Sequence, residues 1–535
     1  MPLRPLNQTS FFDPEFACPD CLDTGTVPWL LARFRSKVFP AWLFVGWRGG
    51  GRGRNAWPAV VLMTLVLLRW TEEGMSRRAS VKRARKDAEW RAALGIALDG
   101  AVPSERTLRD FESFMARQHR EVGQPRYLLF LVHVVRLCVG AGIVDNDAVW
   151  AGDSTPMWCY GAVRDTVRLL GDGLRMLGRQ WAKATRRSFE AVAASWELPW
   201  LLAKSTKGGL NVDWRDADAR AEAVSRLAGD TVRVVEQIRK RLEETRPSFR
   251  KGLLRRLRAL LQVVGNDLEA DEEGRLVVAR HVASDRLVSM TDPQARHGRK
   301  SKSQTFKGFK LHLVGDVVSG LIASLTVAPG NVHDNRPAPR LIRRAKELFD
   351  SFERFLGDTA YGAAELRVTV RDTLGVEILA PPPPARRSTK KLFVKSDFIV
   401  DLDAWTATCP NDVTTDEWTT VRSDGKTRPR FAWPAQACKS CPLHEQCLGK
   451  QRGRRRLILH QYERELRALR AEWDKPETRR AYRIRSQCER LVHSMTRHGA
   501  RRARAWGLRS ANFQAHAIAA VVNLGLLAKA YEDSG

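Results

Sequence analysis

Residues 306–334 read FKGFKLHLVGDVVSGLIASLTVAPGNVHD, and they contain the clearest strand pattern of the sequence. Apolar residues alternate from Phe306 to Val314, and a second apolar run extends from Leu321 to Ala328. Gly315-Asp316 and Ser319-Gly320 separate the two runs, and residues of these types favour a turn. Two apolar runs joined by a turn predict a β-hairpin with antiparallel strands.

Further strands and helices are predicted on both sides of this hairpin. Upstream, residues 147–153 (DAVWAGD) predict a short strand that ends on Asp153, followed by a helical segment of about residues 159–280. The order of elements is that of a ribonuclease-H-like α/β core, so the predicted fold class is α/β. Downstream, strands are expected at 355–358 and 376–379, and helices at 334–349, 363–374, 463–473, 477–498 and 513–531.

Two aspartates stand where predicted strands end. Asp153 is followed by Ser154-Thr155-Pro156, and Asp358 is followed by Thr359-Ala360-Tyr361-Gly362. Ligands gather beyond the carboxyl ends of strands in open α/β sheets, so both carboxylates are expected to extend into one cleft. A single aspartate at a strand end is more often a turn or cap residue, and only the context favours catalysis. Carboxylate oxygens are the ligands that Mg²⁺ prefers, and phosphoryl transfer with two ions uses them.

A third acid occurs in the helix expected over residues 477–498. The residues run Tyr482-x-x-Arg485-x-x-x-Glu489, and offsets of three and four place them on one helix face. The carboxylate can then reach a metal ion while the tyrosine and the arginine contact the DNA backbone, since a guanidinium grips phosphate oxygens in pairs. The alternative is a salt-bridged surface helix, because Arg485 and Glu489 also form an ordinary i,i+4 pair.

Together these residues resemble the DDE transposases of bacterial insertion sequences, in the group with a Tyr-x-x-Arg-x-x-x-Glu signature. The resemblance spans about residues 57–527 and includes a helical region before the catalytic core. It implies metal-assisted hydrolysis at the ends of a mobile element, followed by attack of the liberated 3′-hydroxyl on target DNA. The matching stretches are 152–156 (GDSTP), 291–293 (TDP) with 296–301, 306–310 (FKGFK), 329–334 (PGNVHD), 357–362 (GDTAYG) and 482–489.

The resemblance implies a role for each matching side chain. Asp153, Asp358 and Glu489 would bind two Mg²⁺ (or Mn²⁺) ions. The family pattern often continues with a lysine seven residues after the glutamate, and here that residue is Thr496. The DNA would be held near the scissile phosphate by Tyr482 and Arg485. Further phosphates would be contacted by Lys300, Lys307 and Lys310. The cleft would be lined or supported by Asn331, His333 and Asp334.

A polar, cysteine-bearing insertion is predicted over residues 385–459. Its central Cys-x-x-Cys is the usual nucleating half of a tetrahedral zinc site, but a single cysteine replaces the first pair. The sequence therefore leaves two alternatives, a structural Zn²⁺ ion or unligated thiols, with His444 or His460 as substitute ligands. The four cysteines are Cys409, Cys438, Cys441 and Cys447.

The N-terminal residues 1–125 are predicted to form an all-α domain. Short helices separated by Gly and Ser carry exposed arginines, which fits either a helix-turn-helix variant that binds DNA or a plain helical bundle. The catalytic core is then expected over residues 145–380 plus 460–531. It would be interrupted by the helical insertion (about 159–280) and by the cysteine-bearing insertion.

The charge of the chain favours a polyanionic partner. Among 535 residues, 90 Lys and Arg stand against 60 Asp and Glu, which gives a net charge of +30. Such a surplus suits double-stranded DNA, here transposon ends and target, although an arginine-rich proteome is the alternative.

The longest apolar stretch, Ala59–Leu68, is about half the length that crosses a bilayer, so we expect no membrane partner and a cytoplasmic, nucleoid-associated protein. A homo-oligomer on DNA is expected, because two ends must be brought together.

Two other functions compete with transposition. A ribonuclease-H-like nuclease would use the same metal chemistry without joining strands. A DNA-binding protein that has kept the fold and lost catalysis is the other hypothesis. The presence of an acid at all three positions argues against this second alternative.

Overall fold

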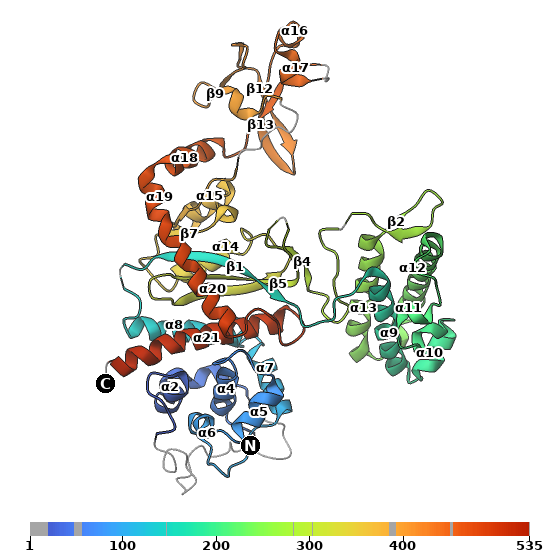
Figure 1. Ribbon diagram of the computed structural model, residues 1–535, viewed down its shortest axis with the longest axis vertical. Coiled ribbons are helices and arrows are strands. Elements are labelled where there is room, and N and C mark those ends of the chain that lie inside the picture. The colour runs from blue at the N-terminus through green and yellow to red at the C-terminus, as the bar shows by residue number, and fades with distance from the viewer. Residues whose placement is uncertain are drawn as a thin grey trace. The chain divides into compact units, whose positions relative to one another are not determined.

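The protein is a mixed α/β chain in a computed structural model (Figure 1). The structure describes residues 20–47, 56–145, 147–281, 283–301, 303–384, 392–449 and 453–533. The chain divides into two compact units, which are described in turn. The first unit comprises residues 1–351 with 487–535, and the second comprises residues 352–486.

The first unit begins with helices. Ser76 and Ser104 cap α5 and α7, because each hydroxyl accepts a hydrogen bond from the backbone N–H three residues on, at 3.1 Å. α4 is buried on nearly every side, which explains why its sequence is apolar without a helical period. The N-terminal elements are α2 (Val27–Arg33), α3 (Arg35–Val38), η1 (Ala41–Phe44), α4 (Ala59–Leu68), α5 (Arg77–Ala84), α6 (Ala88–Leu94), α7 (Glu105–Met115) and α8 (Arg126–Gly140).

A central sheet follows, and the predicted hairpin is confirmed. β5 (Thr305–Asp316) pairs antiparallel with β6 (Ile322–Pro329), and the turn between them is held by the buried Asp316, which accepts hydrogen bonds from the backbone N–H and the hydroxyl of Ser319. β5 also pairs antiparallel with β1 (Trp150–Trp158) and with β4 (Arg296–Arg299).

The C-terminal helix α21 (Leu508–Asp533) satisfies the backbone of β6. The Asn512 side chain accepts from the N–H of Val327 and donates to its carbonyl, and Asn523 does the same for Ile322. Eleven residues of helix and five residues of strand both span roughly 16.5 Å, so the two amides meet the two strand positions in register.

Helices complete the first unit around this sheet (Figure 1). α21 packs against α8, and α14 (Ala338–Lys346) packs against β5 and β6. Among the described residues one helix, α21, is long and apolar enough to cross a membrane, and 78% of its most apolar window is buried inside the structure. Such burial is typical of a core helix.

Residues 166–278 form a bundle with its own apolar core (Figure 1). Buried apolar side chains from the three longest helices of the bundle make up most of that core. The elements are α9 (Thr166–Thr185), α10 (Phe189–Ser195), η2 (Pro199–Leu202), α11 (Thr206–Gly209), α12 (Ala217–Lys240), η3 (Leu242–Glu244), α13 (Pro247–Asp267) and the hairpin of β2 (Leu268–Ala270) with β3 (Leu276–Val278).

The second unit begins with two parallel strands and the helix that joins them. β7 (Arg354–Leu356) pairs with β8 (Glu377–Leu379), and α15 (Ala364–Leu374) connects them. Two small antiparallel sheets and short helices surround a separate apolar cluster. Their elements are η5 (Lys395–Asp397), β9 (Ile399–Asp401), β10 (Thr406–Thr408), β11 (Thr414–Thr415), β12 (Trp418–Ser423), β13 (Lys426–Ala432), α16 (Ala435–Lys439), α17 (His444–Leu448) and β14 (Arg456–Ile458).

The helix expected over residues 477–498 is not continuous. α18 (Glu463–Asp474) and α19 (Pro476–Tyr482) are followed by a 3-10 segment, η6 (Arg483–Gln487), and then by α20 (Cys488–Arg497). A 3-10 segment has about 3.0 residues per turn rather than 3.6, so the predicted face of residues 482–489 is twisted. The spacing of side chains reveals an amphipathic period but not a local change of pitch.

Candidate active site

Asp153 lies within a strand and not at its end. It is the fourth residue of β1, which continues to Trp158 because Thr155 and Met157 are buried and extend the apolar face. In the register of β1 with β5, Asp153 is opposite Leu313. Its carboxylate accepts a hydrogen bond from the N–H of Ser154 at 2.7 Å, which fixes the direction of one oxygen.

Glu489 belongs to the helix that covers the same face of β1. α20 packs against β1 and β5 through its buried face of Cys488, Leu491 and Met495. Gly315 permits this approach, since a Cβ there would lie 3.0 Å from the Leu491 side chain. Gly315 is opposite Ala151, and side chains two residues apart share a face, so α20 lies on the face that carries Asp153. Glu489 itself is exposed.

The opposite face of β1 holds a polar cluster around Asp334. Ser154 donates its hydroxyl to one Asp334 oxygen at 3.0 Å, and the Lys310 ammonium contacts the other at 2.7 Å. Lys310 and Asp334 are almost buried, with 13% and 14% of their side chains exposed. Lys310 is opposite Pro156 in the register, which places it on the Ser154 face and away from the Asp153 face.

His312 completes this cluster in a neutral form. Its Nδ1 lies 3.8 Å from an Asp334 oxygen, and the ring is fully buried. Burial lowers the pKa of His312 to about 4, against the opposing effect of the Asp334 charge. Lys310 therefore supplies the positive charge that balances Asp334 near neutral pH.

Asp358 caps a turn in the second unit. One residue, Gly357, separates it from the end of β7, and its carboxylate accepts from the N–H of Ala360 at 2.9 Å as the N-cap of η4 (Thr359–Tyr361). The buried Tyr361 packs so close to Gly357 that a Cβ at Gly357 would lie 2.6 Å from it. The sequence Gly-Asp-Thr-Ala-Tyr-Gly is thus a compact turn that orients one carboxylate.

Tyr482 and Arg485 belong to this second unit as well. The Tyr482 hydroxyl donates to the carbonyl of Gly357 at 2.9 Å, and its ring packs edge-on against Trp473. Tyr482 therefore ties the end of α19 to the turn that carries Asp358. Arg485 is half-buried within η6.

The other predicted residues fall into two groups. Lys300, in the turn between β4 and β5, and Lys307, on β5, are exposed. Asn331 donates to the carbonyl of Ser284 at 2.9 Å and so braces the loop before β4, and His333 is exposed.

Asp292 is a buried carboxylate that is not among the predicted site residues. It is fully buried and accepts a hydrogen bond from the N–H of Gly507 at 3.0 Å, which joins the loop before β4 to the start of α21. Its other oxygen has no hydrogen-bond partner in the part of the chain that the structure describes. Burial raises the pKa of Asp292 to about 6. The Thr-Asp-Pro motif at residues 291–293 indicates the family resemblance, but it does not indicate that the Asp292 side chain is buried.

The four cysteines of the insertion border one small cavity in the second unit. Cys409, Cys438, Cys441 and Cys447 line it together with His444. Burial raises the pKa of the Cys447 thiol, opposed by the charge of Arg455.

No group of three or more His, Cys, Asp or Glu side chains among the described residues is arranged to hold a metal ion. The carboxylates predicted to do so are divided between the two units, with Asp153 and Glu489 in the first and Asp358 in the second. Their chemistry nevertheless fits Mg²⁺, since all three offer carboxylate oxygens and two are oriented by backbone N–H groups.

Two stretches of the chain match models of known protein families. Residues 27–113 match a transposase domain (DUF772), and residues 408–528 match a transposase DDE domain. The second match begins beside Cys409 and includes Glu489, whereas Asp153 and Asp358 lie outside both stretches. No curated protein and no solved structure matches the chain.

Proposed function

The chain is a DDE transposase of the insertion-sequence type, an enzyme that acts on DNA by cleavage and strand transfer, and from this premise we propose that Asp153, Asp358 and Glu489 are its three catalytic acids. The observation that carries the proposal is the placement of Asp153 and α20 on one face of β1. Further support comes from the turn at Asp358, whose backbone N–H orients the carboxylate.

The three carboxylates would hold two divalent ions, Mg²⁺ or Mn²⁺. When bound, such ions stabilise the attacking and leaving oxygens of phosphoryl transfer and lower the pKa of the attacking water. The side chains of this chain would bind the DNA and hold the catalytic carboxylates in position. Arg485 would grip a phosphate in a forked contact, and Tyr482 would hold the Gly357–Asp358 turn in place while its ring borders the DNA.

The lysines divide into contacts and supports. Lys300 and Lys307 are exposed and are proposed to contact the DNA backbone. Lys310 is engaged with Asp334 on the other face of β1, so we assign it a positioning role, with Ser154 as the link to Asp153. Asn331 and His333 would support the same region from the loop after β6.

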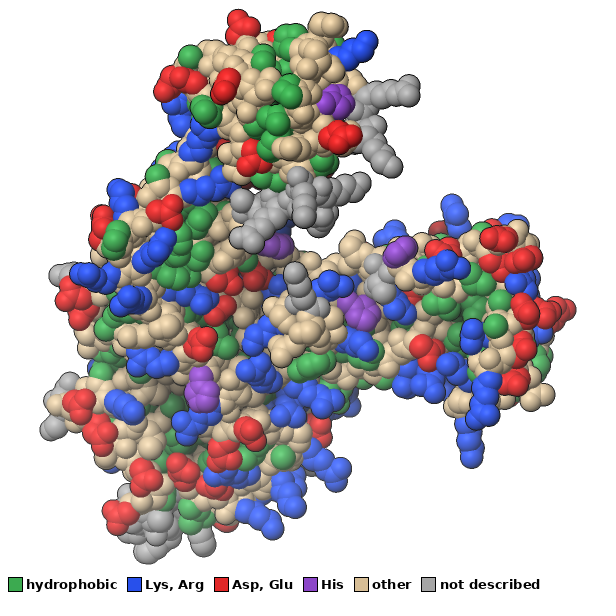
Figure 2. Space-filling view, turned by 45° about the horizontal axis from the view of Figure 1, so that its top comes forward, with side chains coloured by type: hydrophobic (Ala, Val, Ile, Leu, Met, Phe, Trp, Pro, Cys, Tyr) green, Lys and Arg blue, Asp and Glu red, His purple; other side chains and the backbone are tan. Residues whose placement is uncertain are grey.

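We further propose the domain organisation and partners of this enzyme. Residues 1–125 would form an all-α DNA-binding domain, and residues 145–380 plus 460–531 a ribonuclease-H-like core interrupted by insertions at about 159–280 and at 385–459. The charge of +30 supports binding to double-stranded transposon ends and target DNA, and Lys and Arg side chains spread over the face seen in Figure 2. The enzyme would act as a homo-oligomer on the nucleoid, in the cytoplasm.

The cysteine-bearing insertion is proposed to hold a structural Zn²⁺ ion, although the described thiols are not arranged as a metal site in the structure. Support comes from the four thiols, which border one cavity although 28 residues separate the first from the second. Thiolates at four corners make a closed site of the kind that stabilises small folds with little apolar core.

A strand cleavage and joining assay tests the function. Wild type, Asp358→Asn and Asp372→Asn are incubated with the DNA that flanks this gene and with Mg²⁺ or Mn²⁺. Asp372 is exposed on α15 and outside the site, so its variant is the matched control. We expect nicked and joined products with wild type and with the control, and none with Asp358→Asn. DNA binding without cleavage by all three proteins would instead favour an inactive or repurposed DNA-binding protein, and nicks without joined products would favour a nuclease.

A further inference from the structure

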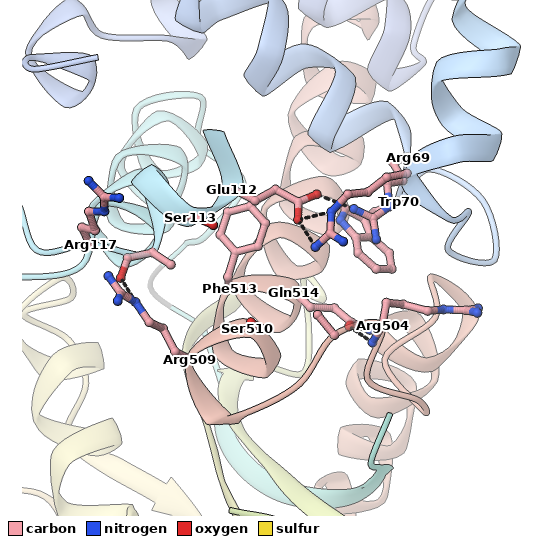
Figure 3. A pocket seen from close by; sticks show the side chains of 13 residues that line it. Arg69, Trp70, Glu112, Ser113, Arg117, Arg504, Arg509, Ser510, Phe513 and Gln514 are labelled. Carbon is pink, nitrogen blue, oxygen red and sulfur yellow. Dashed lines mark hydrogen bonds and ion pairs between the residues drawn. The ribbon is translucent and has the colours of Figure 1, made fainter. Parts of the chain in front are cut away.

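A basic cavity lies in the first unit, where helices from the two ends of the chain meet. Its volume is about 180 Å³, far above the roughly 10–15 Å³ that a single water molecule needs. Residues after α4, at the start of α5 and along α7 line one part, and residues before and within α21 line the rest. In Figure 3, Arg69 and Trp70 lie on one side of the cavity and Arg117 and Arg509 on the other.

Positive charge exceeds negative charge in this cavity. Among the described residues, five arginines line it, and Glu112 is the single carboxylate of the lining. Arg69 and Arg77 both pair with Glu112, each at 2.5 Å, so the charges of Arg117, Arg504 and Arg509 are not balanced by a carboxylate of the lining. The pKa of Arg69 is lowered by burial, and repulsion from Arg77 and Arg504 adds to this effect.

Two buried donors of the lining point to a missing acceptor. The Trp70 indole N–H belongs to a side chain that is 1% exposed, and it has no hydrogen-bond partner among the described residues. The Nε of Arg504 is also buried without a partner there, although its Nη2 donates to the carbonyl of Glu73. Buried donors are rarely left without an acceptor in native proteins, so an oxygen atom of a ligand or of water is expected at this site.

The segment that carries Arg504 also contacts the catalytic strand. The N–H of Trp158 donates to Arg501, and the N–H of Ala503 donates to Trp158. Gln514 fixes this segment, because its amide accepts from the N–H of Arg504 and donates to the carbonyls of Gly499 and Arg502. The same short segment therefore lines the cavity and is hydrogen-bonded to the end of β1.

We propose that this cavity binds a backbone phosphate of double-stranded DNA. Guanidinium groups suit phosphate because their donors match its oxygens in pairs. Arg117, Ser113 and Arg509 are exposed at its rim, so a phosphodiester that remains part of a duplex can reach it. The inference rests on the proposed function, since it concerns how this enzyme binds its DNA. Both matched stretches of the chain, residues 27–113 and residues 408–528, contribute side chains to the cavity.

Two variants test the proposal against a matched control. Ser113→Glu introduces a carboxylate at the rim without removing a packed side chain, and Arg504→Gln removes one unpaired donor. Lys529→Gln is the control, because Lys529 is exposed on α21, lies outside the cavity lining and changes the net charge by the same amount as Arg504→Gln. Affinity for a duplex of the DNA that flanks the gene is measured by fluorescence anisotropy over a range of salt concentrations, without divalent metal.

We expect both cavity variants to reduce the slope of log affinity against log salt by about 0.9, the contribution of one phosphate contact in B-DNA. Binding should weaken equally for duplexes of unrelated sequence, and the control should keep the slope of the wild type. Equal slopes in the cavity variants and the control would overturn the proposal, and so would an equal reduction in all of them.

A second measurement separates DNA from a free anion. Thermal melting is compared in sodium phosphate and in sodium chloride of equal ionic strength. Stabilisation of wild type by phosphate that is lost in Arg504→Gln, with the DNA slope also reduced, supports the proposal. The same stabilisation with an unchanged DNA slope means that the cavity holds a free anion, which overturns it. Strand cleavage by wild type and by Asp358→Asn is measured on the same preparations. Failure of cleavage with an intact phosphate effect would count against the catalytic assignment and not against the cavity.

Discussion

Replacing Lys310 by methionine should destabilise the protein without weakening its grip on DNA phosphates. The family resemblance implies a phosphate contact for this lysine, but its ammonium lies 2.7 Å from Asp334 on the face of β1 that does not carry Asp153. Methionine preserves the length and most of the packing of the side chain. What it removes is the charge that balances Asp334.

The magnitude follows from burial and from the number of partners. Removing one member of a buried ion pair costs about 3–5 kcal/mol, and with 13% and 14% exposure the Lys310–Asp334 pair belongs near the lower end of that range. His312 cannot compensate at neutral pH, because burial lowers its pKa to about 4. Combining Lys310→Met with Asp334→Asn should cost less than the sum of the two single changes by about 1.5–3 kcal/mol, the contribution of a charged hydrogen bond.

Urea unfolding of the single and double variants measures these free energies, and Lys307→Met is the control. Lys307 is exposed on the same strand, so its replacement should change stability by less than about 0.5 kcal/mol while reducing the salt slope of DNA binding by about 0.9. Lys310→Met should show the reverse. Equal stability and an equal salt slope for Lys310→Met and Lys307→Met would contradict the buried ion pair between Lys310 and Asp334.

Three further changes have defined outcomes. Burial raises the pKa of Asp292 to about 6, so the stabilising contribution of this carboxyl group is complete below about pH 4 and is lost as the pH rises through 6. The variant Asp292→Asn keeps an oxygen that can accept from the N–H of Gly507. It should remove up to about 3 kcal/mol of the pH dependence of the unfolding free energy, measured between pH 4 and 7.5. Tyr482→Phe removes the hydroxyl that holds Gly357 and should slow strand cleavage about 2- to 10-fold at saturating DNA with little change in affinity, whereas an equal loss of affinity would point to a direct DNA contact. Cys441→Ser should lose one equivalent of zinc in metal analysis of the purified protein, and a metal-free wild type would contradict the zinc site.

The sequence predicted elements best where a short local pattern was sufficient. Alternating apolar residues and two turn dipeptides specified the hairpin of β5 and β6, and Ser104 marked the start of α7 through one hydrogen bond to its own helix. These features depend on residues a few positions apart. The strand before Asp358 was likewise short and apolar, and its end fell within two residues of the prediction.

Long-range pairing was beyond such patterns. Thr155 and Met157 extend β1 past Asp153 because they pack in the core, although Ser-Thr-Pro is a plausible turn by local preference. The family resemblance implies a DNA contact for Lys310, because Lys310 belongs to the matching stretch of residues 306–310 (FKGFK). The contact of Lys310 with Asp334 depends on the sheet face that Lys310 occupies. That face is set by the register of β5 with β1, which lies about 150 residues earlier in the chain.

The helix α21 shows how a length in the sequence becomes a geometric constraint on the site. Asn512 and Asn523 are eleven residues apart, and the strand positions that they satisfy, Val327 and Ile322, are five apart. Because about 1.5 Å per helical residue and about 3.3 Å per strand residue give the same span, a shift of α21 by one turn would leave both amides and both backbone positions unpaired. The helix is thus held in one register along β6, and its packing against β6 and α8 accounts for its apolar, buried sequence. Since α20 precedes α21 through a segment that Gln514 fixes, the same register also limits where Glu489 can stand along β1.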